Sequence, residues 1–147
     1  MKALTRPLFG IAIFQFLSTM VGFVQLLVVP QWYKEALDPT PFAGMYVLAA
    51  FLLGFVGLWQ LAAIIVHRKA PQWIPLAQAA AGTVMVGWIA GECLAMNSFV
   101  WPHALWGGVG VIQLLLVLEL LGVRKPFRIE PAATDATKPN GVVGKAA

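Results

Sequence analysis

Four long apolar stretches divide the chain, and short polar or proline-containing segments separate them. They cover residues 8–29, 44–66, 76–96 and 104–123. Each is about 20 to 23 residues long, within the roughly 17–25 that a helix needs to cross a bilayer. Backbone N–H and C=O groups must be paired inside hydrocarbon, and the alternation expected of a membrane β-barrel is missing, as residues 114–118 illustrate. The pattern therefore predicts an all-α integral membrane protein, a four-helix bundle.

Composition supports the same class. The chain is 60% apolar and 11% charged, with a mean hydropathy of +0.81. An ordinary soluble domain has about 25% charged residues, so this chain has too few to cover a soluble surface. The single cysteine, Cys93, excludes a disulfide framework and a multi-cysteine metal site. We expect no metal, no cofactor and no nucleic-acid partner.

The basic residues predict the orientation. Nine of the ten Lys and Arg residues lie before the first stretch, between the second and third, or after the fourth, and Lys34 is the exception. The positive-inside rule assigns those three segments to the cytoplasm. We therefore expect a multi-pass protein of the inner (plasma) membrane with both termini cytoplasmic. The first stretch is too long for the apolar region of a signal peptide, which predicts an uncleaved helix.

The C-terminal segment differs from the rest of the chain. Residues 125–147 are rich in Pro, Ala, Thr and Gly and show no apolar periodicity. This composition predicts a disordered cytoplasmic tail after a four-span domain over residues 1–124. Basic residues at the start of the tail are suited to contact anionic lipid headgroups. The net charge of +4 thus indicates topology and lipid contact.

Small residues predict how the helices meet, because close packing through such residues drives helix association in lipid. The third stretch carries a stripe with a spacing of four, and the second and fourth carry glycines: Ala79, Thr83, Gly87, Gly91; Gly54, Gly57; Gly107, Gly108, Gly110. We expect these residues to mediate contacts within one chain. A homodimer through the stripe in the third stretch is the alternative.

Glu92 is the most informative polar residue. An ionisable side chain inside a span is costly and usually marks function or pairing, and Glu92 has no basic neighbour in sequence. Counting 1.5 Å per residue along each helix places it level with polar groups of the other stretches. The resulting outer-leaflet ligand-binding cluster is Gln25, Tyr46, Glu92, Asn97 and His103. Alternatively, Glu92 bonds to a neighbouring helix and His103 simply lies in the interface.

A second polar group is predicted in the inner half of the membrane. It comprises Gln15, Gln60, Gln78 and Glu119. Amide side chains commonly link helices in membranes, so we interpret this group, and Gln113 near the middle of the fourth stretch, as structural. Glu119 lies near the cytoplasmic Arg124, with which it can pair, or its carboxylate can reach the interface.

Three segments carry a family resemblance. They are Phe42-Ala43-Gly44-Met45-Tyr46, Gly87-Trp88-Ile89-Ala90-Gly91-Glu92, and the short polar loop before Gly107-Gly108. In these features and in its span count, the chain resembles the small four-span bacterial membrane proteins called DoxX-like, over residues 8–123. The resemblance implies a four-span membrane fold. Some such proteins are similar to accessory subunits of respiratory or redox complexes, and no residue role follows from the resemblance.

Catalytic signatures are missing from the sequence: it has no nucleophile elbow and no exposed glycine-rich phosphate loop. We therefore expect a non-catalytic accessory, assembly or apolar-ligand-binding protein. Its expected partner is the lipid bilayer, and another membrane protein or a second copy of the chain stays open. The alternative is a membrane-embedded enzyme or proton-coupled transporter that acts on a hydrophobic substrate, with Glu92 and His103 as the catalytic candidates.

Overall fold

The computed structural model describes residues 2–123, which form helices and no strands. The elements are α1 (Lys2–Val28), the 3-10 helix η1 (Pro30–Tyr33), α2 (Lys34–Leu37), α3 (Tyr46–Lys69), the 3-10 helix η2 (Pro71–Trp73), α4 (Ile74–Met96) and α5 (Trp101–Leu120). Four helices, α1, α3, α4 and α5, are long and apolar enough to cross a membrane. The prediction of an all-helical chain with four such segments is confirmed. The predicted tail, residues 125–147, lies outside the described residues.

Prolines mark the starts of two long helices. Pro75 and Pro102 stand in the first positions of α4 and α5, where the missing N–H would have no partner in the helix. Pro7 has a different position in its helix. Helix α1 begins at Lys2 and Pro7 lies inside it. A proline near the start removes only one backbone hydrogen bond, so helix α1 continues through it.

A glycine ends α5 earlier than the apolar pattern suggests. Gly122 has a φ of 73°, a left-handed conformation that glycine adopts at little cost. Its N–H donates to the Glu119 carbonyl at 3.0 Å, and the Val123 N–H donates to the Leu118 carbonyl at 3.1 Å. These two bonds form a Schellman motif. The last helix therefore ends at Leu120, although the apolar stretch continues to residue 123.

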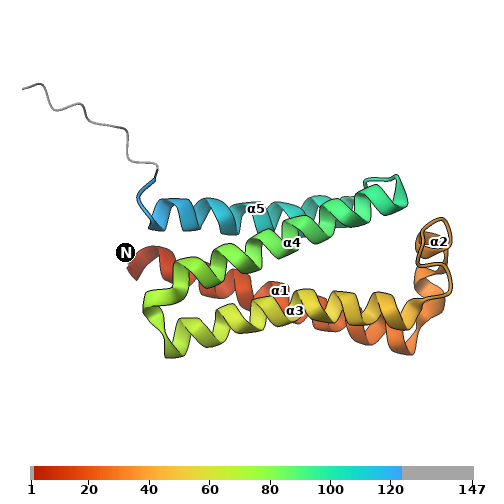
Figure 1. The fold of residues 1–147 in the computed structure, drawn as a ribbon, viewed down its shortest axis with the longest axis horizontal. Helices are drawn as coiled ribbons and strands as arrows, with labels where there is room; N and C mark the ends of the chain where they lie inside the picture. The colour runs from red at the N-terminus through yellow and green to blue at the C-terminus, as the bar shows by residue number, and fades with distance from the viewer. Residues whose placement is uncertain (1, 124–147) are drawn as a thin grey trace, which may run out of the picture.

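The long helices are arranged as two antiparallel pairs, α1 with α3 and α4 with α5 (Figure 1). We call the end of the molecule that carries the α1–α3 connection and the α4–α5 loop the α2 end. The opposite end, where η2 joins α3 to α4, is the η2 end. Figure 1 shows the two pairs separating toward the α2 end, where α2 lies beside the ends of α1 and α3.

The two buried clusters differ in which helices contribute to them. Toward the η2 end, Ala12 of α1, Ala63 of α3 and Ala81 of α4 form a buried cluster, and such small side chains allow helices to approach closely. At the α2 end, the buried cluster of Leu26, Ala49 and Ala50 packs with residues of α1, α3, η1 and α2 only. Helices α4 and α5 contribute nothing to that second cluster, so space remains between the two pairs.

Glycines in α3 and α5 lie against neighbouring helices. A Cβ atom added at Gly54 would meet the Phe23 ring of α1 at 3.1 Å, and one added at Gly110 would meet the Val86 side chain of α4 at 3.0 Å. These positions therefore permit the close contacts within each helix pair.

The small residues of the stripe on α4 were expected to contact other helices of the chain, and this expectation is wrong at Gly87 and Gly91. An added Cβ atom at either position would meet nothing within 4 Å. The α4 glycine that contacts another helix is Gly82, which lies against Leu114 of α5. At 100° per residue, Gly82 is about 180° around the helix from Gly91. Helix α4 therefore packs on α5 with another face than the stripe suggests.

One fully buried glutamine from each long helix contributes to a polar layer across the molecule. The members of this glutamine layer are Gln15, Gln60, Gln78 and Gln113. The prediction had Glu119 in place of Gln113, and it is wrong, because Glu119 is exposed on α5. The two residues are six positions apart, which rotates them about 120° from one another on the helix.

Hydrogen bonds connect the four amides. The Gln60 amide nitrogen donates to the Gln15 side-chain oxygen, to the Ala81 carbonyl at 3.2 Å and to Gln113 Oε1 at 3.4 Å. The Gln113 amide nitrogen donates to Gln60 Oε1 at 3.3 Å and to Gln78 Oε1 at 2.6 Å. An amide has only two hydrogens, so Gln60 shares one between two acceptors. The layer links all four long helices.

Candidate functional site

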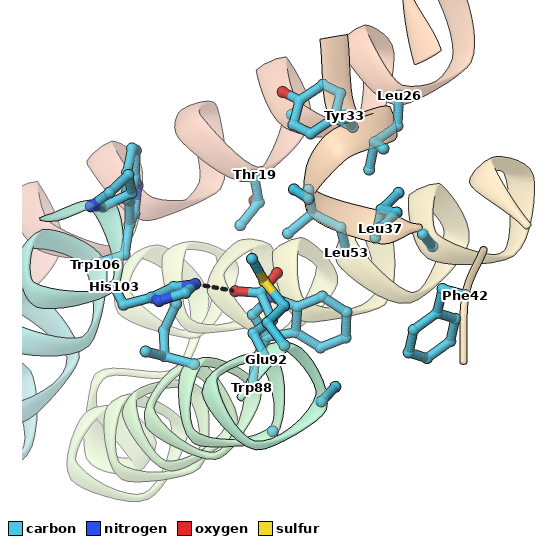
Figure 2. A pocket seen from close by; sticks show the side chains of 18 of the residues that line it. Thr19, Leu26, Tyr33, Leu37, Phe42, Leu53, Trp88, Glu92, His103 and Trp106 are labelled. Carbon is cyan, nitrogen blue, oxygen red and sulfur yellow. Dashed lines mark ion pairs between the residues drawn. The ribbon is translucent and has the colours of Figure 1, made fainter. Parts of the chain in front are cut away.

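A cavity of about 800 Å³ lies between the two helix pairs at the α2 end (Figure 2). All four long helices line it, as do η1, α2 and the loop before α3. Most of its lining is apolar, including Leu26, Leu53, Met85 and Ile89. Sites for small molecules typically have volumes of about 300–1,000 Å³ and apolar walls with a few polar groups. In size and lining, this cavity fits that description.

The connection between α1 and α3 covers part of the cavity. Proline at the start of η1 turns the chain after α1, so Tyr33 and Leu37 fold back over the ends of α1 and α3. The Tyr33 hydroxyl donates to Gln25 Oε1 at 2.6 Å. Burial raises the pKa of the Tyr33 hydroxyl above its usual value, because the ionised form loses hydration there. Tyr33 therefore acts as a neutral donor that fixes this segment on α1.

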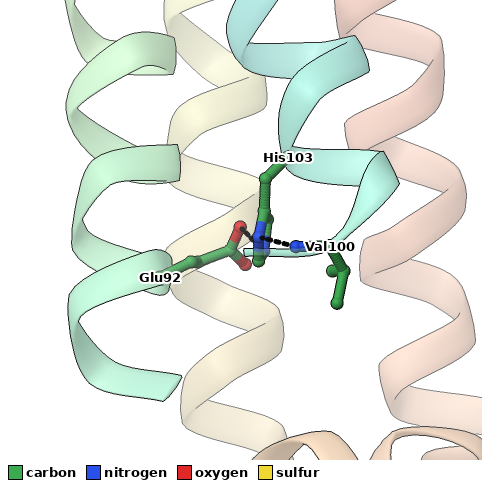
Figure 3. Close-up of polar contacts among 3 residues, drawn as sticks. All are labelled: Glu92, Val100 and His103. Atoms are coloured by element: carbon green, nitrogen blue, oxygen red, sulfur yellow. Dashed lines mark hydrogen bonds and ion pairs between the residues drawn. The ribbon is translucent and has the colours of Figure 1, made fainter. Parts of the chain in front are cut away.

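Glu92 and His103 face each other on the wall formed by α4 and α5 (Figures 2 and 3). His103 Nε2 lies 3.8 Å from Glu92 Oε2. This separation is too long for a hydrogen bond but short enough for an electrostatic contact. The side chain of His103 is 7% exposed and that of Glu92 is 34% exposed. The imidazole is therefore enclosed by protein, whereas the carboxylate is open to the cavity.

The start of α5 fixes the His103 ring. The Val100 N–H donates to His103 Nδ1 at 3.3 Å, and the His103 N–H donates to the Val100 carbonyl at 2.9 Å (Figure 3). Because Nδ1 accepts a hydrogen bond, the hydrogen of the neutral ring belongs on Nε2. His103 thus caps α5 with one nitrogen and directs an N–H group toward Glu92 with the other.

Few ionisable side chains line the cavity. The ionisable side chains among its lining residues are Tyr33, Glu92 and His103. Lys34, the basic residue of the connecting segment, is exposed and does not line the cavity. Trp88 lies one turn before Glu92 on α4 and lines the same wall (Figure 2). The cavity therefore holds one acid and no lysine or arginine.

The structure brings together part of the predicted outer-leaflet cluster. Gln25, Glu92 and His103 line the cavity, whereas Tyr46 and Asn97 do not. Asn97 is exposed and caps α4 with a φ of 46°. Sequence reasoning did not assign Tyr33 or Trp88 to the site. Trp88 stands one helical turn from Glu92, a spacing that puts both on one face of α4 and that could have identified it.

Metal coordination would need more ligands than this wall supplies. Within residues 2–123, no group of three or more His, Cys, Asp and Glu side chains could hold a metal ion. The pair of Glu92 and His103 contributes two side chains of these types to the wall.

No protein-family model, curated protein or solved structure matches the chain. The class of the protein follows from its own fold and composition. Four helices are long and apolar enough to span a membrane, and the chain is 60% apolar. These features indicate a small multi-pass membrane protein.

Proposed function

We propose that this protein binds a lipophilic molecule in the cavity at its α2 end, without catalysing a reaction. The observation that carries the proposal is a cavity of about 800 Å³ with apolar walls and one carboxylate–imidazole pair. Removing apolar surface from water is favourable by roughly 25 cal/mol per Å², but a ligand that arrives from lipid gains little of this. Affinity must then come from shape and from the few polar groups of the wall.

The proposal includes a position in the cell. The four long helices form a bundle that crosses the inner (plasma) membrane with both termini in the cytoplasm, as the positive-inside rule suggests. The α2 end then lies toward the outer face, and the cavity lies in the outer leaflet. In this position, a lipophile would enter directly from the bilayer. An accessory or assembly role beside another membrane protein, in keeping with the DoxX-like resemblance, is part of the same proposal.

A cavity-filling variant tests the binding proposal. Gly91 lines the cavity, and a Cβ atom there would meet nothing within 4 Å, so Gly91→Leu adds an apolar side chain at the cavity wall. Gly108→Leu and Gly10→Leu are matched controls, because their added Cβ atoms also meet nothing and neither residue lines the cavity. All three changes replace glycine by a better helix former.

The probe is a neutral alkane that carries a benzophenone group, photoactivated with the full chain in detergent micelles. We expect labelling of cavity residues such as Met85 and Met96, which mass spectrometry locates. This labelling is lost in Gly91→Leu and retained in both control variants. Labelling confined to lipid-facing residues such as Leu94, which is 82% exposed, would contradict the proposal.

The second candidate is an enzyme or a proton-coupled transporter that acts on a hydrophobic substrate. The observation that favours it is the separation of 3.8 Å between Glu92 Oε2 and His103 Nε2, across which a ligand hydroxyl could exchange a proton with both groups. Under this function, Glu92→Gln and His103→Ala abolish turnover or flux in a folded protein. Under the binding function, neither variant has a turnover to lose.

A further inference from the structure

The charge of the cavity wall restricts what ligand it accepts. Glu92 is the one carboxylate among the lining residues, and no lysine or arginine lines the cavity. A carboxylate away from water is costly when no cation lies beside it, and the Glu92 side chain, 34% exposed, lines the cavity. A cationic ligand would supply the missing countercharge, whereas an anionic ligand would be repelled.

His103 does not hydrogen-bond the Glu92 carboxylate. Its Nδ1 accepts the Val100 N–H, which fixes the ring at the start of α5. The other ring nitrogen, Nε2, lies 3.8 Å from Glu92 Oε2, beyond hydrogen-bond distance. The carboxylate oxygens that face the cavity therefore remain accessible to a ligand.

Aromatic side chains line the same cavity as the acid. Trp88 lies beside Glu92 on α4, and Trp106 follows His103 on α5 by one turn (Figure 2). Phe42, in the loop before α3, lines the cavity from the other helix pair. Aromatic faces attract cations at distances up to about 6 Å from the ring centre. The same rings also provide apolar surface for the uncharged body of a ligand.

These observations converge on one ligand class. We infer that the cavity binds a lipophilic cation, such as a protonated tertiary amine or a quaternary ammonium ion with an apolar body. The Glu92 carboxylate contacts the cationic group of this ligand. This inference depends on the proposed binding function and adds the chemistry of the ligand. The cavity volume of about 800 Å³ accommodates a body of several rings or a branched chain.

Two ions of nearly the same shape and opposite charge test the inference. Tetraphenylphosphonium and tetraphenylborate are added separately to the full chain in dodecyl maltoside micelles, and binding is measured by equilibrium dialysis. Specific binding is the amount of ion bound by the wild type minus the amount bound by Gly91→Leu. This subtraction removes the contribution of ion that partitions into the micelle. We expect saturable binding of the cation at one site per chain, and binding of the borate that is weaker by about tenfold or more.

Variants of the acid show whether Glu92 carries the preference. Glu92→Gln keeps the shape and should weaken cation binding by about tenfold or more, whereas Glu92→Asp keeps the charge and should keep the preference for the cation. Glu119→Gln is the matched control, because Glu119 is an acid of α5 that does not line the cavity. It should bind the cation as the wild type does.

Each contrary result has a separate meaning. If the neutral photoprobe labels the cavity but both ions bind equally, or Glu92→Gln binds the cation normally, the cation inference is wrong and the proposed function stands. If the photoprobe and both ions fail to bind specifically, the proposed function is wrong and the inference falls with it. Should Glu92→Gln fail to fold, Glu92→Asp and the comparison of the two ions still decide the question.

Discussion

Replacing Gln60 by leucine should destabilise the protein more than any other single change in the glutamine layer. Gln60 takes part in four hydrogen bonds, which reach α1, α4 and α5. Polar contacts between helices in membranes contribute about 0.6 kcal/mol each on average. Four such contacts sum to roughly 2.4 kcal/mol. Leucine has a similar volume, so a cavity adds little to this loss.

The arrangement of the layer also predicts how two changes combine. Gln113 takes part in three hydrogen bonds, and two of them are shared with Gln60. By the same average, Gln113→Leu should cost roughly 1.8 kcal/mol. The double variant removes five different bonds and should cost roughly 3.0 kcal/mol. The sum of the two single effects should therefore exceed the effect of the double variant by roughly 1.2 kcal/mol. This difference is the coupling energy between Gln60 and Gln113.

Reversible unfolding by sodium dodecyl sulfate in mixed micelles, followed by circular dichroism, measures these free energies. The control is Gln72→Leu, because Gln72 is exposed in η2 and its replacement should change the free energy of unfolding by less than about 0.5 kcal/mol. If Gln60→Leu resembles this control, the layer does not stabilise the fold. If the effects of Gln60→Leu and Gln113→Leu are strictly additive, the two side chains do not interact as described.

Three further predictions concern other parts of the molecule. Tyr33→Phe removes the hydroxyl bond to Gln25 and should lower the free energy of unfolding by roughly 1 kcal/mol. Because burial raises the pKa of Tyr33, its contribution to the free energy of unfolding is present below about pH 10 and is lost at higher pH. The free energy of unfolding measured against pH should show this decline in the wild type and not in Tyr33→Phe. In Gly57→Ala the new Cβ would lie 2.6 Å from Thr19 Oγ1, so the free energy of unfolding should fall by about 1–3 kcal/mol. An added Cβ at Gly108 would meet nothing within 4 Å, so Gly108→Ala should stay within about 0.5 kcal/mol of the wild type. Tags at both termini should resist protease added to the outside of intact cells, and digestion of one tag alone would refute the even number of spans.

The sequence was sufficient to predict four helices that are long and apolar enough to cross a membrane, because a long apolar stretch has few alternatives in lipid. It also predicted that Glu92 and His103 lie close together. The two residues flank a short connection between antiparallel helices, so counting residues from the helix ends gives their depth. Position along the helix axis is therefore the quantity that an apolar sequence determines well.

Rotation of each helix about its own axis is the quantity that the sequence did not determine. A soluble helix shows its buried face by its polar side, but these helices are apolar on every face. Glu119 was therefore placed in the layer that contains Gln113, and the α4 stripe was oriented toward a helix although Gly91 faces open space. Tyr33 was missed for a different reason, because the fold of the segment after Pro30 depends on its contact with Gln25.

The glutamine layer also bears on the energy stored across the membrane. Carboxamides neither release nor take up protons at physiological pH, and the fully buried side chains of the layer are all of this kind. A proton carried by Glu92 at the α2 end thus meets amides in the centre of the bundle, which cannot pass it on by titration. Under the proposed function, the protein can therefore hold a guest molecule in one leaflet while the bilayer remains insulating to the proton gradient.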